Sequence, residues 1–376
     1  MIREFPYRVR FRNFRLILFV CLLTGIGILL IQSAGPGYER RQAAGFILGL
    51  LSLLVFALLD YKRLLEAGWI IYLGAVLLLV LVILMGAVSG GAGRWLSLGP
   101  VRFQPSELAK ILLIWFFAWF FGRKQEQMGD IRWVIIFLIL GAAPVFLILE
   151  QPDLSTSIVV MWMFLCILFL AGIHGRILLY GAAFGLPAAG VLLFLITRPN
   201  QQILNEYQYR RIMAWLSPSA WSQDSYQQRN SIMAFASGGL SGKGLGTDST
   251  LSVKNGNFLP EPHTDFIMAV AGEELGFFGC ILMLMLLFLI TAECLWIGFR
   301  TRDLAGKLIC GGMAALISGQ AFVNLCVVTG LMPNTGLPLP FVSYGLTSLV
   351  SLYMGIGVVV NVGLERTGRD RVFLQS

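Results

Sequence analysis

Charged side chains are scarce in this chain. Lys, Arg, Asp and Glu make up 13% of its 376 residues, whereas soluble proteins carry about 25%. Hydrophobic residues account for 57%. So few charged groups do not cover the water-facing surface of a soluble protein, and the composition therefore indicates an integral membrane protein. The net charge of +8 then sets membrane topology or attracts anionic lipids, and it does not indicate a nucleic-acid partner.

Paired cysteines and metal-binding clusters are also missing. The six cysteines all lie inside apolar runs, and none forms a Cys-x-x-Cys pair. Such cysteines pack as small hydrophobic side chains. The sequence therefore predicts neither a disulfide framework nor a zinc site.

Long apolar runs are what the chain has in abundance. A hydrocarbon core of about 30 Å requires about 20 apolar residues in a helix. The sequence predicts an all-α integral membrane protein with ten transmembrane helices, one polytopic domain over residues 1–376. The predicted spans are 14–33, 42–59, 67–88, 106–122, 132–150, 154–172, 176–197, 264–298, 305–331 and 340–363. The first run could instead be a signal peptide, but the topology requires it as a span.

Basic residues orient these spans. If the N-terminus is cytoplasmic, the inside segments contain most of the Lys and Arg residues, beginning with the arginines that precede the first span. This predicts a multi-pass membrane protein with both termini in the cytoplasm. Residues 198–262 then form a large extracytoplasmic loop between the seventh and eighth spans. Its Trp and Tyr residues predict short helices at the membrane surface.

The stretch FLPEPHTDFIMAVAGEELGFFG, residues 258–279, places ionisable groups at the start of the eighth span. Such groups are costly at membrane depth and are usually functional. The prolines predict that the helix starts at Thr264 as its N-cap, with Asp265 in the first turn. An acid there could instead only complement the helix dipole. Glu273 and Glu274 lie deeper, and each requires a basic or hydroxyl partner.

The stretch GRWLSLGPVRFQPSELAK, residues 93–110, is the second polar cluster. Gln104 and the following proline favour a helix start, and Glu107 and Lys110 share a face of that helix. This pattern fits a capped helix with an internal ion pair. Alternatively, Arg94, Arg102 and Lys110 converge at the outer surface to hold a phosphate, with Trp95 against a sugar ring.

Three further segments offer weaker signals. SGGLSGKGLGT, residues 237–247, could be a flexible loop or a clamp in which Lys243 holds a diphosphate, but it is not a Walker A loop. Asp153 follows a tight turn and could simply cap the next helix. Ser343 lies in the proline-rich PNTGLPLPFVSYG, residues 333–345, which is more typical of a shape-determining segment than of chemistry.

These segments, together with QPDLST, occur in an order that closely resembles the SEDS family (shape, elongation, division and sporulation), whose members include FtsW, RodA and SpoVE. The similarity runs from about residue 34 to residue 363. The sequences of the motifs QPDLST and RFQPSELAK are more similar to the elongation type, RodA, than to the division type. The resemblance implies a peptidoglycan glycosyltransferase that polymerises lipid II at the outer face of the plasma membrane during cell elongation. The essential acid of the family falls on Asp265 and its important tryptophan on Trp95. The chain departs from the family's usual sequence in two places. Ser155 stands where the family has a glycine, and Leu346 and Thr347 stand where it has Gly-Ser.

The resemblance also implies partners, namely lipid II, a class B penicillin-binding protein and other cell-elongation membrane proteins; a homo-oligomer stays open. Asp265 is expected to act as general base on the acceptor sugar hydroxyl, with undecaprenyl diphosphate leaving. A divalent cation such as Mg²⁺ or Mn²⁺ could assist. The expected substrate-binding residues are Arg94, Trp95, Gln104, Ser106, Glu107, Lys110, Arg210, Arg211, Lys243, His263, Thr264 and Ser343. Asp153, Glu273 and Glu274 are expected to support them.

Two other functions fit the residues. A lipid II flippase or transporter could use Glu273, Glu274 and Lys110 as a relay across the membrane. Alternatively, the chain could be a scaffold whose sole function is to recruit the penicillin-binding protein. The clustering of polar residues towards the outer side favours chemistry on one face.

Overall fold

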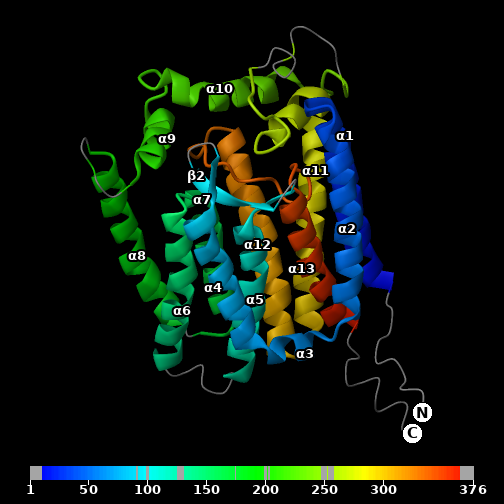
Figure 1. The fold of residues 1–376 in the computed structure, drawn as a ribbon, viewed down its shortest axis with the longest axis vertical. Helices are drawn as coiled ribbons and strands as arrows, with labels where there is room; N and C mark the ends of the chain where they lie inside the picture. The colour runs from blue at the N-terminus through cyan, green and yellow to red at the C-terminus, as the bar shows by residue number, and fades with distance from the viewer. Residues whose placement is uncertain are drawn as a thin grey trace.

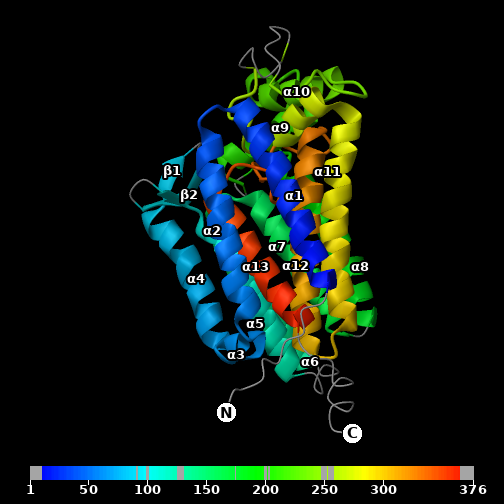
Figure 2. The same ribbon diagram turned by 90° about the vertical axis from the view of Figure 1, so that its right-hand side faces the viewer.

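The computed structural model describes residues 11–89, 92–98, 101–124, 131–173, 175–198, 201, 204–246, 252 and 258–364. Its long helices run side by side between two ends of the molecule (Figure 1). α9 and α10 lie across one end, here called the α10 end. α3, the start of α1 and the end of α13 lie at the other, here called the α3 end (Figures 1 and 2). The elements are α1 Phe11–Ala34, α2 Tyr38–Leu58, α3 Tyr61–Glu66, α4 Gly68–Met85, β1 Ala87–Ser89, β2 Ala92–Leu98, β3 Val101–Phe103, α5 Pro105–Arg123, α6 Ile131–Glu150, α7 Leu154–Leu170, α8 Gly175–Ile196, α9 Glu206–Leu216, α10 Ser222–Ser237, α11 Ile267–Arg300, α12 Leu304–Val328 and α13 Leu346–Leu364.

Three helices form the interior of the bundle. The most apolar stretches of α5, α12 and α13 are buried for 78%, 83% and 78% of their residues, against 28–39% for α1, α2, α4, α6 and α11. The outer helices expose large apolar side chains such as Leu73, Leu84 and Phe288. Because the hydrocarbon of a bilayer accommodates such side chains, this is the pattern of a membrane protein rather than of a soluble bundle.

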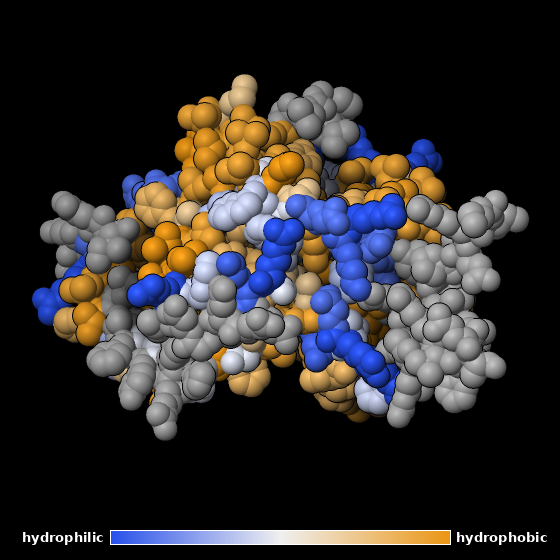
Figure 3. Space-filling view, turned by 90° about the horizontal axis from the view of Figure 1, so that it is seen from below, coloured by the Kyte–Doolittle hydropathy of each residue, from blue (hydrophilic) through white to orange (hydrophobic). Residues whose placement is uncertain are grey.

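Eight helices in the described part of the chain are long and apolar enough to cross a membrane. The other two predicted spans fold as α7, which has 17 residues, and α8, which has 22. Seen from the α3 end, hydrophilic side chains gather over the middle of the face and hydrophobic ones lie beside them (Figure 3). Several arginines used to predict the orientation, in residues 1–10 and 365–376, lie outside the described residues.

A small antiparallel sheet makes the all-α prediction wrong in one place. β1, β2 and β3 pair in that order, with Ala87 opposite Trp95 and Leu96 opposite Phe103. The predicted third span ran to residue 88, but α4 ends before Gly86, which is extended with φ −65° and ψ 130°. The many glycines that follow disfavour a helix, and residues 87–89, 92–98 and 101–103 pair as strands instead.

Two predicted helix starts are also wrong. α11 begins at Ile267, after Thr264 and Asp265, and Thr264 donates its hydroxyl to the Glu261 carbonyl rather than capping the helix. α13 begins at Leu346, so residues 333–345 stay non-helical. We call this segment the strap. Its prolines lack the N–H that a helix interior requires, which explains the late start.

The glycine-rich segment 238–244 packs against a break in α11. Gly276 has φ 65° and ψ −163° inside this helix. The peptide N–H groups of Lys243 and Gly244 donate to the carbonyls of Glu273 and Glu274, and Phe277 donates to Gly239. A Cβ on Gly276 would lie 2.3 Å from the Gly242 nitrogen. The glycines therefore permit a close approach of two backbones, and nothing in this packing supports the predicted diphosphate clamp.

Gly276→Ala is expected to lower the free energy of unfolding by about 3 kcal/mol or more, because its backbone conformation is open almost only to glycine and the added carbon meets the loop. Thermal unfolding in detergent measures the effect. Gly74→Ala is the matched control, since a Cβ there meets nothing within 4 Å. A similar unfolding temperature for both variants would contradict the role given to the close approach.

Candidate active site

Asp265 lies in the turn before α11, and the carbonyl groups of this turn are held by hydrogen bonds. The His263 carbonyl accepts from the Tyr344 peptide N–H at 2.9 Å, and the Thr264 carbonyl accepts from the Ser343 hydroxyl at 2.7 Å. The Asp265 carbonyl accepts from Asn324 Nδ2 on α12 at 2.9 Å. Since non-helical backbone inside a membrane bundle requires such partners, the strap and α12 together fix the acid's backbone.

The Asp265 carboxylate and two arginines meet beside Gly336 of the strap. A Cβ on Gly336 would lie 3.2 Å from Asp265 Oδ2, 3.6 Å from Arg211 Nη1 and 3.8 Å from Arg94 Nη1. Gly336 has φ +76°, a conformation that favours glycine. Four separate segments of the chain therefore meet at this point: β2, α9, the turn before α11 and the strap.

Each arginine is fixed by further contacts. Arg94 donates to the Pro152 carbonyl, and its Nη1 lies 3.7 Å from Asp153 Oδ1. Asp153 also caps α7 by accepting from the Thr156 N–H, so the predicted cap is confirmed and the residue has a second contact. Arg211 donates to the Asn334 carbonyl at 3.1 Å and lies 4.4 Å from the centre of the Tyr207 ring. Such contacts pre-organise both guanidinium groups.

Burial and charge act in opposite directions on Asp265. Burial raises the pKa of its carboxyl from 3.8 to about 6, while Arg211 and Arg94 lower it, and Glu261 and Asp153 raise it. A carboxylate with a pKa near 6 accepts a proton far more readily than an ordinary Asp, and it is still ionised at pH 7. The site thus combines a base with two fixed cations.

A narrow crevice adjoins the arginines. It is lined by Arg94, Pro152, Leu154, Tyr207, Gln208, Arg211, Ile212, Pro333, Asn334 and Thr335. Within the described part of the chain, Arg94 Nε, Asn334 Oδ1 and Thr335 Oγ1 are buried without a hydrogen-bond partner. Buried polar atoms are normally paired, so these atoms are suited to contact a bound polar group beside the two cations.

Lys110 and Glu107 lie inside the bundle rather than at its surface. Lys110 Nζ lies 2.7 Å from Glu107 Oε1 and donates to Gln320 Oε1 at 3.0 Å, while Ser348 donates to Glu107 Oε2. Lys110 is 1% exposed. The predicted position of Lys110 at the outer surface is therefore wrong, because this residue follows a full turn of α5 and faces α12. The predicted ion pair is confirmed.

Arg210 and Lys243 have other partners. Arg210 Nη2 lies 3.0 Å from Asp224 Oδ2 on α10, and Lys243 Nζ lies 2.7 Å from Glu273 Oε1. Ser33 of α1 donates to Glu274. The prediction that each glutamate has a basic or hydroxyl partner is confirmed. Both cations are therefore engaged in ion pairs with other carboxylates.

The remaining predicted residues surround the strap. His263 stacks on Tyr38 with ring centres 4.1 Å apart, and burial lowers the pKa of its imidazole. The Ser343 hydroxyl accepts from the Leu339 N–H and donates to Thr264, so it is engaged within the protein. Gln104 precedes α5 without a side-chain cap, Ser106 is buried, and Trp95 follows Arg94 on β2.

Sequence reasoning missed Asn324, Gly336 and Tyr207. Asn324 is 1% exposed inside an apolar helix, and a buried amide within a span is a signal that could have found it. Gly336 and Tyr207 stand among other glycines and aromatic residues, and their pattern carries no comparable signal.

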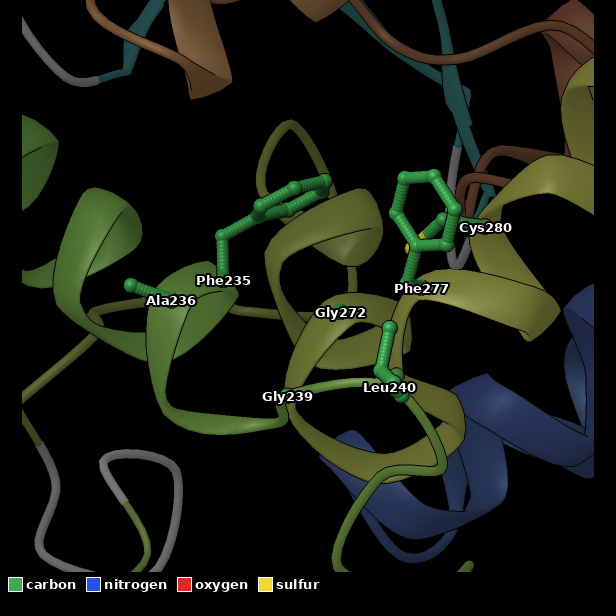
Figure 4. A pocket seen from close by; sticks show the side chains of 8 residues that line it. Phe235, Ala236, Gly239, Leu240, Gly272, Phe277 and Cys280 are labelled. Carbon is green, nitrogen blue, oxygen red and sulfur yellow. The ribbon is translucent and has the colours of Figure 1, made fainter.

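A separate apolar pocket lies at the break in α11. Phe235 and Phe277 project towards it in Figure 4, and Gly272, Gly239 and Leu240 border it. It has a volume of about 300 Å³, and Cys280 is its only lining residue with a titratable side chain. Unlike the Asp265 site, this pocket is lined by no carboxylate and no basic side chain among the described residues.

A polytopic helical bundle with a carboxylate and two arginines at one end defines a membrane enzyme suited to an anionic substrate. Residues 14–368 match the family model of the FtsW, RodA and SpoVE proteins, described as "Cell cycle protein", and this chain belongs to that family.

Relatives and solved structures agree with this assignment. The chain is 37% identical to the peptidoglycan glycosyltransferase MrdB of Escherichia coli over 93% of both chains. It is 34% identical to the probable peptidoglycan glycosyltransferase FtsW of Geobacter metallireducens over 94% of this chain and 95% of the relative. A chain in a structure of a peptidoglycan synthase complex matches with a TM-score of 0.76 and 30% identity over 97% of this chain and 98% of the other. Thermus thermophilus RodA matches with a TM-score of 0.68 and 29% identity over 97% of each chain.

Asp265→Asn is expected to stabilise the protein at neutral pH. Since burial raises the pKa of this carboxyl from 3.8 to about 6, folding favours its protonated form, and stability falls as pH rises from 3.8 through 6. The full penalty, roughly 3 kcal/mol, is present above pH 6. The variant's gain in unfolding temperature should be largest at pH 8 and shrink towards pH 4. An equal gain at both pH values would contradict the pKa shift.

Proposed function

We propose that this chain is a peptidoglycan glycosyltransferase that polymerises lipid II into glycan strands during cell elongation, with Asp265 as general base. Membership of the FtsW, RodA and SpoVE family and the similarity to named peptidoglycan glycosyltransferases support the activity. The observation that carries the mechanism is the meeting of Asp265, Arg94 and Arg211 around Gly336.

The proposed reaction transfers a sugar with inversion. Asp265 takes the proton of an acceptor sugar hydroxyl as that oxygen forms a bond to the anomeric carbon of the donor. The bond from that carbon to the diphosphate breaks, and undecaprenyl diphosphate leaves with the electron pair. Negative charge grows on the diphosphate, so Arg94 and Arg211 stabilise the transition state more than the ground state.

Substrate binding should also strengthen the base. The two arginines lower the pKa of Asp265 in the free protein. A bound diphosphate would offset their positive charge and remove part of this lowering. The carboxylate would then accept a proton more readily when the donor is in place.

The proposed topology has ten spans, with α7 and α8 counted beside the eight long apolar helices. The α10 end, which contains Asp265, faces the outside, and both termini are cytoplasmic in the bacterial plasma membrane. Residues 198–262 form the extracytoplasmic loop, whose α9 and α10 lie across that end (Figure 1). Lipid II displayed on the outer leaflet would then reach the acid laterally.

The proposed partners are a class B penicillin-binding protein and other cell-elongation membrane proteins, and a homo-oligomer stays open. The similar chain solved within a peptidoglycan synthase complex supports a partner of this kind. A divalent cation such as Mg²⁺ or Mn²⁺ could share the charge of the diphosphate. The described residues contain no group of three or more His, Cys, Asp or Glu suited to hold a metal ion, so such an ion would arrive with the substrate.

The alternative is a lipid II flippase or transporter. It would use buried charged groups along the bilayer, and the Lys110–Glu107 pair inside the bundle is the feature that favours it. A liposome assay separates the two functions, since movement of labelled lipid II without polymer identifies a transporter.

Asp265→Asn is expected to abolish polymerisation while folding and membrane insertion remain normal, because the amide has the same shape but does not accept the proton. The purified variant and the wild-type protein are incubated with lipid II, and glycan chains are separated on a gel. Full-length product from the variant would rule out the base.

Arg211→Gln is expected to lower the polymerisation rate by about 10²-fold or more, because a cation at the leaving group is lost. The acid limb of the rate–pH profile of this variant should move to higher pH, since Arg211 lowers the pKa of Asp265. Arg210→Gln is a matched control, because the neighbouring arginine pairs with Asp224 instead. Polymerisation rates are measured for both variants as a function of pH. An equal loss of rate in the two variants would contradict the assignment of Arg211.

A further inference from the structure

We propose that Asn324 is a positioning residue for the reaction, which sets the place of the Asp265 carboxylate by holding its backbone against the strap. The inference deepens the proposed function and rests on Asp265 acting as the base. This role requires no contact between Asn324 and the substrate.

Asn324 binds the acid and the strap with one amide group. Its Nδ2 donates to the Asp265 carbonyl at 2.9 Å and to the Leu337 carbonyl at 2.7 Å. Leu337 directly follows Gly336, the residue beside which the carboxylate and the two arginines meet. A single planar group therefore fixes both walls of the site relative to each other, from a helix that lies in the interior of the bundle.

The Asp265 peptide depends on Asn324 more than its neighbours do. The carbonyls of His263 and Thr264 are held by residues of the strap itself, Tyr344 and Ser343. The Asp265 carbonyl is instead held from α12, by Asn324. The direction of the side chain follows from the direction of its peptide, so this bond acts on the position of the carboxylate.

A second side-chain amide on α12 binds the strap next to the residue that Asn324 binds. Gln320, one turn earlier, donates to the Pro338 carbonyl at 2.9 Å, and its Oε1 accepts from Lys110 at 3.0 Å. Since Lys110 occupies the oxygen, the nitrogen of this amide is directed to the strap. The buried Lys110–Glu107 pair thus supports the bond to the Pro338 carbonyl, which is adjacent to the Leu337 carbonyl that Asn324 binds.

The geometry matters because misplacement of a catalytic group by about 1 Å can cost about 10²-fold in rate. Without Asn324 the Asp265 peptide is free to rotate away from Arg94 and Arg211. The charged groups that act on the carboxylate are those two arginines, Glu261 and Asp153. Moving away from the arginines removes the cations that keep the carboxyl ionised.

The test compares Asn324→Ala with Asn361→Ala in the purified full-length protein with lipid II as substrate. Asn361 is equally buried, donates to the Ala57 carbonyl and accepts from the Tyr61 N–H, but it lies on α13 beside α3. Both variants lose one buried amide with two hydrogen bonds. They differ in that only Asn324 contacts the acid.

Asn324→Ala is expected to lower kcat by about 10-fold to 10²-fold, with KM for lipid II changed less than about threefold, and to move the acid limb of the rate to higher pH. Asn361→Ala should lower the unfolding temperature while kcat per folded molecule and the acid limb stay as in the wild type. If Asn324→Ala does not fold, Asn324→Ser, which keeps one donor, is measured against the same criteria.

A kcat and an acid limb for the Asn324 variant that match those of Asn361→Ala would overturn the inference. Asp265→Asn is run alongside. If it polymerises at the wild-type rate, the proposed base is wrong, and the inference fails with it. If it is inactive while Asn324→Ala is normal, only the positioning role is wrong.

Discussion

The strap places buried, non-helical backbone in the interior of a membrane protein, and this constraint governs the surroundings of the site. Peptide groups without partners are costly where water is scarce, so each must be met by a side chain. Gln320 and Asn324 donate hydrogen bonds to the carbonyls of Pro338 and Leu337, respectively. Ser155 donates one to the carbonyl of Thr335. At the end of the strap, Gln42 of α2 donates to the Ser343 carbonyl and accepts from the Gly345 N–H. The polar residues inside these spans are therefore largely the structural support of one extended segment.

The electrostatics of the acid follow from the same segment. Because Gly336 has no side chain, Asp265 and the two arginines can meet beside the strap. The carboxylate is desolvated there, which raises its pKa, and the arginines limit the rise so that it remains ionised at neutral pH. Arg94 and Arg211 are in turn oriented by Asp153 and by the Asn334 carbonyl. The carboxylate and the two cations are thus held in a fixed arrangement by the protein itself.

Buried charge elsewhere in the bundle has a different purpose. Lys110 and Glu107 neutralise each other and direct Gln320 towards the strap, and Lys243 pairs with Glu273 beside the break in α11. Removing one member of such a pair would leave an uncompensated charge. Loss of activity on substitution of these residues would therefore not by itself place them in contact with substrate.

The sequence by itself determined the class of protein, most of the helices and the residue at the centre of the site. Apolar runs longer than a bilayer requires are a property of the chain, and the family's motifs identified Asp265 before its surroundings were known. The tertiary structure decided which cations accompany it. Arg210 and Arg211 are adjacent in sequence, yet successive residues on a helix point about 100° apart, so one meets Asp224 and the other reaches the acid. The strand pairing of residues 87–103, the late start of α11 and the role of Asn324 likewise depend on contacts between segments far apart in the chain, which local patterns do not encode.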